Sequence, residues 1–538
     1  MSYHHDFNSL PNMKKFLLPA LAAAIPALAM AQSATDAYTL TQSDLRGTAR
    51  FMSMGGAFTA LGGDLSAVNV NPASLGVYRS SEIGATLDVG FHNFKTSLSS
   101  QNKTTAACNN FGYVGVVNLS GAMRTFAWGA NYNRVSSFDR IIDGYSPTLH
   151  SSLSNYVAGF TNGTPYQDLE FTDSYNPYAQ SNEDWLSILA YNSYLINPNS
   201  ASGTEYQGLF GQGSVADSYY YSRERGYVDE YNFSFGGNVS NVVSWGVNIG
   251  VTDLSYTRDV AYDESIGGAD IATNSGRLAP GKAEFTLSNS QHVTGTGWNL
   301  NFGVIIRPIN ELRFGFSVKT PTWWSLQHAA IGAVDYSFNP DNSNLGSLNG
   351  YEETDQANFD SRLTSPWRFN LGVAGVIGSS AIVSIDYERT AYPDMTMKHQ
   401  GQWYNDFVSA TAVNDDIKNY YQAANSLRVG VEYRVTPQFS LRAGYAWQST
   451  AVKDAAADGT EEIYTSGTDP SYVFNKAVNS ISVGAGYRYK SWYIDAAYVH
   501  KKRSSTYYCF TDWAGGIAPS GNVDENVNTI VLSTGFRF

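Results

Sequence analysis

The sequence predicts an all-β transmembrane protein: a 14-stranded antiparallel outer-membrane β-barrel with a small N-terminal helical hatch (plug) in its lumen. Three observations predict this fold. Segments of ten or more residues alternate apolar and polar side chains, short turns alternate with long loops between them, and the chain ends on an aromatic residue, Phe538. The first two are typical of barrels that cross a bilayer with strands.

Residues 1–31 predict a leader with a signal peptide. A short basic region begins at Met13, the expected start of translation, and an apolar run follows it. Small residues at Ala29 and Ala31 form the pattern that signal peptidase reads, so we expect cleavage before Gln32 and export of the mature chain. No cysteine follows the cleavage site, so no lipid anchor is expected there.

The composition after the leader favours strands. Aromatic residues make up 14% of the chain, with 37 Tyr, while Gly numbers 49 and only 15% of residues are charged. No window of about 18 apolar residues is present, so no membrane-spanning helix is expected. The net charge of −13 argues against nucleic acid as a partner.

The segment 427–435 illustrates the alternation, because Leu427 and Val431 share one face while Arg428 and Glu432 share the other. The expected strands are 82–96, 111–120, 124–138, 226–241, 243–261, 288–307, 311–331, 363–378, 381–397, 424–435, 438–451, 477–489, 491–505 and 527–538. Their number is even, as in bacterial single-chain barrels, and both ends of the wall then face the periplasm. A soluble sandwich or propeller is the alternative, but it does not explain the signal peptide, the loop asymmetry and the terminal aromatic residue together.

The connections between these strands differ sharply in length. Short turns are expected near Ser240-Asn241, 307–312, Gly378-Ser379 and 436–438. Long polar loops are expected at 139–225, 262–288, 332–362, 398–424, 452–476 and 506–526. Residues 81–538 therefore form the barrel, with its long loops on the extracellular side.

Residues 32–80 precede the first strand and predict the hatch. Its apolar face has helical spacing and consists of Phe51, Met54, Phe58, Leu61 and Leu65. The pairs Gly55-Gly56 and Gly62-Gly63 weaken a continuous helix, so two short helices with a break are expected. A barrel of this size has a lumen wider than its own side chains fill, and this segment is suited to close it.

The stretch "RFMSMGGAFTALGGDLSAVNVNPASLG" resembles the hatch of the FadL family, outer-membrane transporters of long-chain fatty acids and other hydrophobic compounds. Asn71, Pro72 and Ala73 match the hatch motif of that family. The resemblance implies passive uptake without a cofactor, a ligand pocket beside the hatch, and lateral exit at an inward kink of the third strand. Gly129 lies in that strand and is the candidate kink; simple packing accommodation is the alternative.

The longest loop predicts a helix between Ser181, with Asp184 three residues on, and Asn197-Pro198. Its apolar residues include Trp185, Leu186, Ile188 and Leu189. Two interpretations are compatible: a capture surface for an apolar ligand, or packing against neighbouring loops.

The chain has two cysteines, Cys108 and Cys509. We expect them in the first and last extracellular loops, which meet in a closed barrel, so a bridge between them is a hypothesis.

Charged residues on the lumen faces of the strands have two interpretations. They are Asp386, Glu388, Arg428, Glu432, Arg434, Arg442, Arg488 and Asp495. Pairing within a wet barrel interior is favoured over acid–base chemistry, although one arginine is suited to a ligand carboxylate. The eight His show no metal-ligand spacing and no G-x-S-x-G motif is present, so neither a metal site nor an enzyme is expected.

These observations lead to one expected function and two alternatives. We expect a monomeric channel in the outer membrane of a Gram-negative bacterium, in contact with outer-membrane lipid, that carries a hydrophobic small molecule without a cofactor. A FadL-scaffold protein acting in protein secretion or surface attachment is the first alternative, and an outer-membrane hydrolase is the second. The identity of the ligand is left open between acyl chains, aromatic hydrocarbons and haem.

Overall fold

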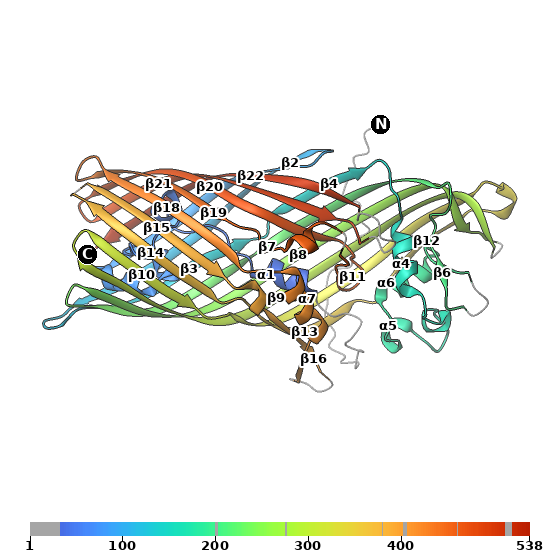
Figure 1. Cartoon of the computed structure of the whole chain (residues 1–538), viewed down its shortest axis with the longest axis horizontal. Helices are drawn as coiled ribbons and strands as arrows, with labels where there is room; N and C mark the ends of the chain where they lie inside the picture. The colour runs from blue at the N-terminus through green and yellow to red at the C-terminus, as the bar shows by residue number, and fades with distance from the viewer. Residues whose placement is uncertain are drawn as a thin grey trace.

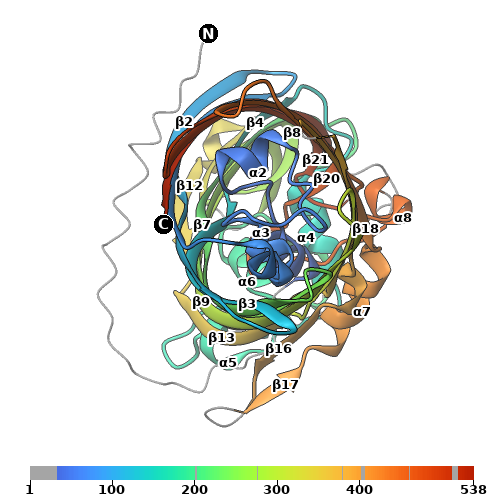
Figure 2. The same ribbon diagram turned by 90° about the vertical axis from the view of Figure 1, so that its left-hand side faces the viewer.

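The wall of the molecule is a closed antiparallel β-barrel of 14 strands, as predicted (Figures 1 and 2). The computed structural model describes residues 33–199, 203–274, 277–378, 380–401, 406–459, 461–511 and 519–538. The expected leader lies outside these residues. β1 (Glu82–Lys95) pairs with β22 (Ser520–Arg537) along its whole length, and this contact closes the sheet.

Between these two, the wall strands follow one another in chain order, and four of them are interrupted once. They are β2 (Ser100–Asn118), β3 (Met123–Ser137) with β4 (Arg140–Ser146), β7 (Val215–Val239), β8 (Val243–Ala272), β9 (Leu278–Ile309), β10 (Leu312–Lys319) with β11 (Trp323–Pro340), β13 (Ala357–Thr364) with β14 (Arg368–Ile377), β15 (Ala381–Thr390) with β16 (Thr396–Gln400), β18 (Ala424–Arg434), β19 (Phe439–Gln448), β20 (Tyr472–Tyr489) and β21 (Trp492–Tyr508).

Short helices and small strands complete the fold. The hatch contains α1 (Ala34–Thr41), α2 (Ala49–Ser53), α3 (Ala67–Val70) and the 3₁₀ helix η2 (Pro72–Val77); the loops contain α4 (Leu153–Thr161), η3 (Tyr166–Asp168), α5 (Pro177–Gln180), α6 (Trp185–Asn192), β5 (Asn197–Pro198), β6 (Tyr206–Gln207), η4 (Ser343–Leu345), β12 (Leu348–Glu353), η5 (Tyr392–Asp394), β17 (Phe407–Ser409), α7 (Thr411–Tyr420) and α8 (Asp454–Ala457). Among the described residues, no helix is both long and apolar enough to cross a membrane.

A belt of exposed apolar side chains surrounds the wall near its turns, as the hydrocarbon core of a bilayer requires. Leu87, Phe233 and Leu532 on this belt are 62%, 54% and 53% exposed. Exposed aromatic residues mark its two edges: Trp298, Trp323, Trp367 and Trp447 on one, and Tyr489, Trp492 and Phe538 on the other. On β8 the apolar row ends at Val251, and polar residues follow from Asp253 onward.

The two ends of the barrel differ, and we call them the turn end and the loop end. Ser240 and Asn241 form a tight hairpin with φ of 54° and 59°, as two-residue hairpin turns require. Gly378 also has a positive φ, 59°. The predicted turns at these positions are confirmed. The chain terminus at Phe538 lies at the turn end (Figure 1).

Several predicted loops are wrong, because the strands continue beyond the belt. β8 and β9 pair through most of 262–288, leaving a short turn at 273–277. Likewise β2 begins at Ser100, where a loop was expected. Above the belt the alternation is reversed: the outward face carries Asp, Ser and Thr, while the inward face buries apolar residues such as Leu254, Val260 and Phe285. These long strands form a tall extension on one side of the loop end (Figure 1).

Three neighbouring wall strands bend at prolines just beyond the belt. Pro321 separates β10 from β11, Pro366 separates β13 from β14, and Pro393 lies in η5 between β15 and β16. Proline cannot donate to the ladder, so it interrupts strand pairing. Beyond the interruptions, β16, β17 and α7 lie outside the ring of the barrel when it is viewed from the turn end (Figure 2).

Candidate functional site

The hatch lies inside the barrel, and α2 and α3 are seen within the ring from the turn end (Figure 2). The five residues of its predicted apolar face, Phe51, Met54, Phe58, Leu61 and Leu65, are all at most 5% exposed. The Phe51 and Phe58 rings lie 5.3 Å apart.

The predicted break between two short helices is present, but helix covers less of the hatch than the spacing suggested. Residues 54–66 form turns, and all four glycines of the Gly55-Gly56 and Gly62-Gly63 pairs have φ between 63° and 76°. Positive φ values end a right-handed helix, so Phe58, Leu61 and Leu65 are buried from irregular backbone. The sequence did not predict α1.

The backbone of the hatch lies directly against glycines of the wall. A Cβ on Gly315 would overlap the carbonyl oxygen of Thr59, and one on Gly246 would overlap that of Pro72. The wall glycines at this level also pair across neighbouring strands: Gly236 with Gly246, Gly246 with Gly303, Gly315 with Gly372, and Gly430 with Gly444. We call this set the glycine tracks. They give the hatch room that any side chain would occupy.

Buried ion pairs attach the hatch to the opposite side of the wall. Arg50 Nε donates to Glu432 Oε2 at 2.9 Å, and Arg442 Nε donates to the same oxygen at 2.6 Å. Arg442 Nη1 also bonds Asp495 Oδ1 at 2.6 Å. Asp386 Oδ2 accepts from the backbone N–H of Thr59 at 2.6 Å. Glu432, Arg442 and Asp495 therefore pair as predicted, and Glu432 also bonds the hatch.

Asn71 of the predicted motif joins the hatch to itself and to the wall. Its Nδ2 donates to Thr59 O at 2.7 Å, Val304 O at 3.3 Å and Phe316 O at 3.4 Å, and its Oδ1 accepts from Ala73 N at 3.0 Å. The side chain is fully buried. These contacts are architectural, as the resemblance implied.

A cavity of about 820 Å³, open to solvent, lies between the hatch and the wall. The hatch lines it with the segment from Gln42 to Leu45 and with Tyr38, and the wall lines it with Glu388, Arg428, Trp447, Lys501 and Arg503, among others. Lys501 Nζ bonds Asp44 Oδ1 at 3.1 Å, and Arg428 Nη2 bonds Glu388 Oε2 at 3.0 Å. Nη1 of Arg428 is buried and has no hydrogen-bond partner among the described residues. The cavity therefore combines aromatic walls with a guanidinium that has a free donor.

The wall has no kink at Gly129. The β2–β3 ladder runs without a register shift past this residue, which pairs with Val114 on one side and Ser234 on the other. Gly129 faces Leu75 of the hatch, so the packing alternative describes it and the kink prediction is wrong.

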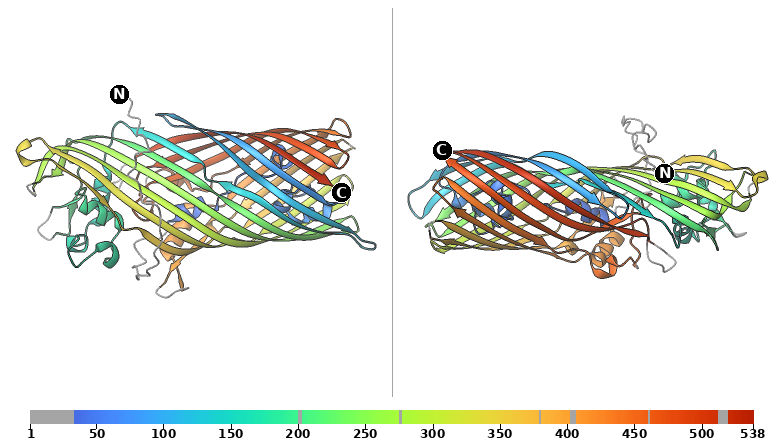
Figure 3. Two further views of the ribbon diagram at one scale, coloured as in Figure 1. Left: turned by 180° about the vertical axis from the view of Figure 1, so that it is seen from behind. Right: turned by 90° about the horizontal axis from the view of Figure 1, so that it is seen from above.

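The wall instead separates at a seam between β2 and the β3–β4 strand. The β2–β3 ladder ends at Asn110 and Asn133, and residues 100–108 of β2 pair with β1 alone. Only the backbone pairing is interrupted there, because Lys103 Nζ pairs with Asp139 Oδ1 at 2.5 Å and Gln101 Nε2 donates to Asp143 Oδ2 at 2.9 Å; Figure 3 (left) shows the β1–β2 hairpin and β4 from behind. Since Leu87 on the apolar belt lies opposite Cys108, the seam begins at the level of the belt.

The hatch covers the inner side of this seam. The Asp44 N–H donates to Val135 O at 3.1 Å, directly above the point where β2 leaves β3. Arg46 Nη1 bonds Asn109 Oδ1 at 2.8 Å and Asp88 Oδ2 at 3.2 Å on the opposite edge. The hatch segment 42–46 therefore separates the cavity from the seam.

The predicted capture helix is present as α6, but it is a core element. Trp185, Leu186, Ile188 and Leu189 are at most 5% exposed and pack with α4 and the tall extension. The packing interpretation describes these buried side chains, of which Trp185 also lines a pocket nearer the loop end. The helix begins after Asp184, whereas Ser181 ends α5.

The carboxylate of Glu264 attaches α4 to the tall extension. Glu264 lies 13 residues beyond Val251 on β8, outside the belt, and accepts from Ser152 Oγ at 2.5 Å, Leu153 N at 2.8 Å and Tyr262 Oη at 2.6 Å. Burial raises its pKa to about 7 despite these donors. The folded state therefore holds the proton more tightly than the unfolded state does.

We expect the packing of α4 to weaken as pH rises. The proton-linked stability is complete below the unfolded pKa of about 4.5 and is lost as pH passes about 7, a loss of roughly 3 kcal/mol. Hydrogen exchange of α4, corrected for the intrinsic pH dependence, measures this, and Glu264→Gln should remove the dependence. Equal protection of wild-type α4 at pH 5.5 and 8.5 would contradict the prediction.

The hypothesis of a Cys108–Cys509 bridge is wrong, because both thiols are free. Cys108 lies within β2, not in a loop, at the level of Leu532 on β22, whereas Cys509 pairs with Pro519. Thirteen residues of extended strand separate these levels, or roughly 40 Å. A disulfide requires Cα atoms within about 7 Å.

One histidine–serine contact is present, between His328 Nε2 and Ser361 Oγ at 3.0 Å. Both residues are buried, and the Phe359 ring stacks on the imidazole at 4.6 Å. A substrate has no open approach to this hydroxyl. Within the described residues, no group of three or more His, Cys, Asp or Glu side chains is suited to a metal ion.

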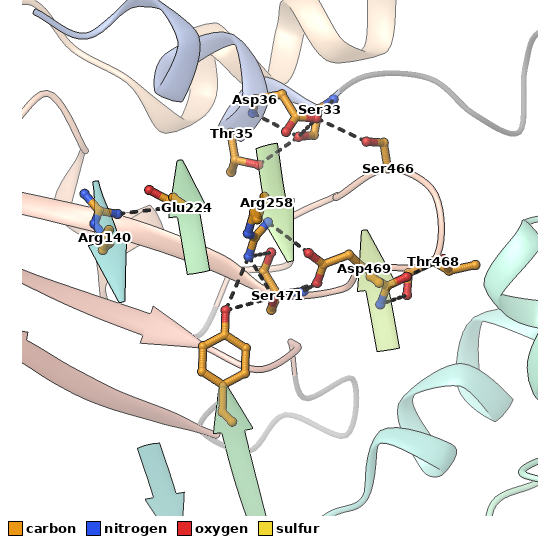
Figure 4. A network of polar contacts seen from close by, with 12 residues as sticks. Ser33, Thr35, Asp36, Arg140, Glu224, Arg258, Ser466, Thr468, Asp469 and Ser471 are labelled. Atoms are coloured by element: carbon orange, nitrogen blue, oxygen red, sulfur yellow. Dashed lines mark hydrogen bonds and ion pairs between the residues drawn. The ribbon is translucent and has the colours of Figure 1, made fainter. Parts of the chain in front are cut away.

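A second pocket, of about 620 Å³ and open to solvent, lies nearer the loop end, where hydroxyl groups are abundant (Figure 4). Arg258 bonds Asp469 Oδ2 at 2.9 Å and Ser471 Oγ at 2.8 Å. Asp36 at the start of the hatch accepts from Ser466 Oγ at 3.1 Å. The loop 465–471 is thereby tied to the first turn of α1, and this network has a structural explanation.

Comparison with protein-family models found no match, and comparison with curated proteins found none either. Among solved structures, a FadL homologue from Pseudomonas aeruginosa aligns over 92% of this chain and 99% of its own, at 15% identity and a TM-score of 0.53. The toluene transporters TodX of Pseudomonas putida and TbuX of Ralstonia pickettii align over 93% and 92% of this chain and 100% and 99% of theirs, at 13% and 16% identity and TM-scores of 0.47 and 0.46. The likeness to the FadL homologue concerns the fold: a plugged 14-stranded barrel.

Proposed function

We propose that the protein is a channel of the Gram-negative outer membrane that passes hydrophobic small molecules of the long-chain fatty-acid type by diffusion. One observation carries the proposal: the cavity, the hatch segment 42–46 and the seam lie in sequence from the lumen to the apolar belt. The turn end then faces the periplasm and the long strands face outward. The fold shared with the FadL homologue supports this assignment.

The cavity is suited to an amphiphile with an acidic head. The unpartnered Nη1 of Arg428 offers a hydrogen-bond donor to a carboxylate, and Lys501 adds a second positive charge nearby. Tyr38 and Tyr392 provide apolar surface for the chain that follows the head. We propose that the carboxylate binds Arg428.

Lateral exit at the seam completes the proposed path. A molecule with an acyl chain avoids the aqueous periplasm if it leaves through the wall into lipid. The β2 edge of the seam is built from Thr104, Thr105, Ala106 and Ala107, whose small side chains leave room for passage. The hatch segment 42–46 must shift first, because its backbone and Arg46 join the two edges. The Lys103–Asp139 pair and the Gln101–Asp143 bond, which cross the seam directly, must also open.

Mass spectrometry of small molecules released from the protein in a lipid nanodisc tests the ligand class. We expect a bound acyl chain in the wild type and reduced occupancy in Arg428→Gln, with Arg124→Gln, an exposed arginine at the turn end, as the matched control. An empty cavity in a preparation that contains a secreted protein would instead support the secretion alternative.

Uptake tests the route. Ala107 lies on the lumen side of the seam, opposite Asp88, while Ala443 lies in a fully paired part of the wall. We expect Ala107→Trp to lower uptake of a labelled fatty acid about tenfold, because raising the free-energy barrier to passage by roughly 1.4 kcal/mol slows it by that factor. Ala443→Trp should leave uptake unchanged. Equal uptake by both variants would place the exit elsewhere.

A further inference from the structure

Three arginines come together on the lumen side of the turn end. Arg79 lies just after the hatch, Arg307 near the end of β9, and Arg313 at the start of β10. The Arg307 N–H donates to Val242 O at 2.7 Å, and Arg79 Nη2 donates to the neighbouring Asn241 Oδ1 at 3.4 Å. One turn of the wall thus places the hatch arginine beside the two wall arginines.

None of the three forms an ion pair with a carboxylate in the part of the chain that the structure describes. Arg313 Nη1 donates to Leu61 O at 2.8 Å, and its Nε is buried without a partner. Arg79 Nη1 donates to the carbonyl groups of Gly76 and Tyr78 at 3.1 and 3.2 Å. The printed guanidinium contacts of Arg79 and Arg313 are therefore to neutral oxygen atoms, the carbonyl groups of Gly76, Tyr78 and Leu61 and the Asn241 amide.

The carboxylates of this region are used elsewhere or point away. Glu82 accepts from Arg537 Nε at 2.7 Å and from Tyr493 Oη at 2.7 Å. Glu311 is exposed in the β9–β10 turn and forms no ion pair with the three arginines. Deeper in the lumen the pattern differs, because Arg50 and Arg442 are both paired with Glu432. Three neighbouring arginines without an ion pair among the described residues therefore lie at this end, in a chain whose net charge is −13.

We propose that Arg79, Arg307 and Arg313 form a binding site for an oxyanion, a phosphate or carboxylate group, which ties the end of the hatch to the wall. Guanidinium groups suit such anions because their planar donors match two oxygens at once. Burial and the positive charge of Arg307 lower the pKa of Arg79. A bound anion would offset the repulsion between these two arginines. The site does not depend on which molecule the channel transports.

Two sources of such an oxyanion are available at a face that opens to the periplasm. Free phosphate is one, and the phosphodiester of an inner-leaflet phospholipid is the other. We therefore titrate inorganic phosphate, and separately dihexanoyl phosphatidylglycerol, into the full-length protein in maltoside micelles at constant ionic strength. Calorimetry measures binding, and hydrogen exchange of residues 54–77 measures the hatch.

Wild-type protein should give a saturable heat and slower exchange in the hatch. Arg307→Gln and, as a second variant in an exposed position, Arg79→Gln should each weaken binding about tenfold, the effect expected from one charge-assisted hydrogen-bonded pair. Arg124→Gln removes an exposed arginine at another turn and should bind as the wild type does.

Each outcome decides the proposal. Saturable binding of both probes supports a general oxyanion site, and binding of the lipid alone supports a headgroup site. The absence of saturable heat with either probe, or equal affinity in wild type, Arg307→Gln and Arg79→Gln, would overturn it. Unchanged exchange of the hatch at saturation would refute the tie between hatch and wall.

Discussion

Gly315→Val is expected to displace the hatch and open the barrel. The added side chain would occupy the position of the Thr59 carbonyl group, which is backbone and has no alternative rotamer. Overpacking of this kind costs about 3 kcal/mol, and this raises the fraction of open hatch by roughly two orders of magnitude. Single-channel conductance in planar bilayers measures the opening directly.

Gly375→Val is the matched control for that experiment. Gly375 and Gly372 both lie on β14, the strand that neighbours β10 with its Gly315, and three positions separate them. Nothing lies within 4 Å of a Cβ placed on Gly375. This variant should conduct as the wild type does, while both variants keep the heat-modifiable migration of a folded barrel. A closed Gly315→Val barrel would mean that the glycine tracks do not position the hatch.

Asn71→Leu is expected to release the hatch without a steric clash. The substitution keeps the number and branching of the side-chain heavy atoms but removes its bonds to Thr59, Val304, Phe316 and Ala73. Leaving buried backbone groups unpaired costs about 1–3 kcal/mol each, so protection of hatch amides from exchange should fall by at least about tenfold. Hydrogen exchange with mass spectrometry measures this loss.

Asn69→Ala provides the comparison, because Asn69 lies in α3, which Asn71 directly follows, and its Oδ1 has no partner among the described residues. Its exchange should match the wild type. Conductance should also rise in Asn71→Leu, though less than in Gly315→Val, since the hatch can still fit its space. Wild-type protection in Asn71→Leu would show that wall contacts elsewhere hold the hatch.

The sequence was most informative where one face of a segment meets lipid. There, apolar and polar residues alternate, as in 427–435, and the strands were located within a few residues. Above the belt the outward face is polar and the apolar inward face is interrupted by charged residues such as Arg258 and Glu264, so the upper parts of β8 and β9 lack the lipid-facing pattern and were predicted as loops. Strand number survived this failure because the tight turns at the other end, such as Ser240-Asn241, were still recognisable.

The site was harder to predict, because it depends on contacts between distant segments. Helical spacing in the hatch identified which residues are buried, although much of the segment is not helical. Nothing local indicates that Gly315 faces Thr59, or that the β2–β3 ladder ends at Asn110. Gly129 was a reasonable candidate for a kink, yet its freedom serves contact with Leu75. The sequence could not single out Arg428 and its free donor, because the eight charged lumen residues looked equivalent in it.

The closure of β1 on β22 also constrains how the molecule is assembled. The hatch precedes β1 in the chain, and the ladder that closes the wall joins β1 to β22, the last strand. Pairing of such distant segments is entropically costly and slow. Because the glycine tracks leave no spare space, the hatch is expected to be in place before this ladder forms. The wall is then expected to form around the hatch. A barrel whose wall closes before the hatch is in place would stay leaky.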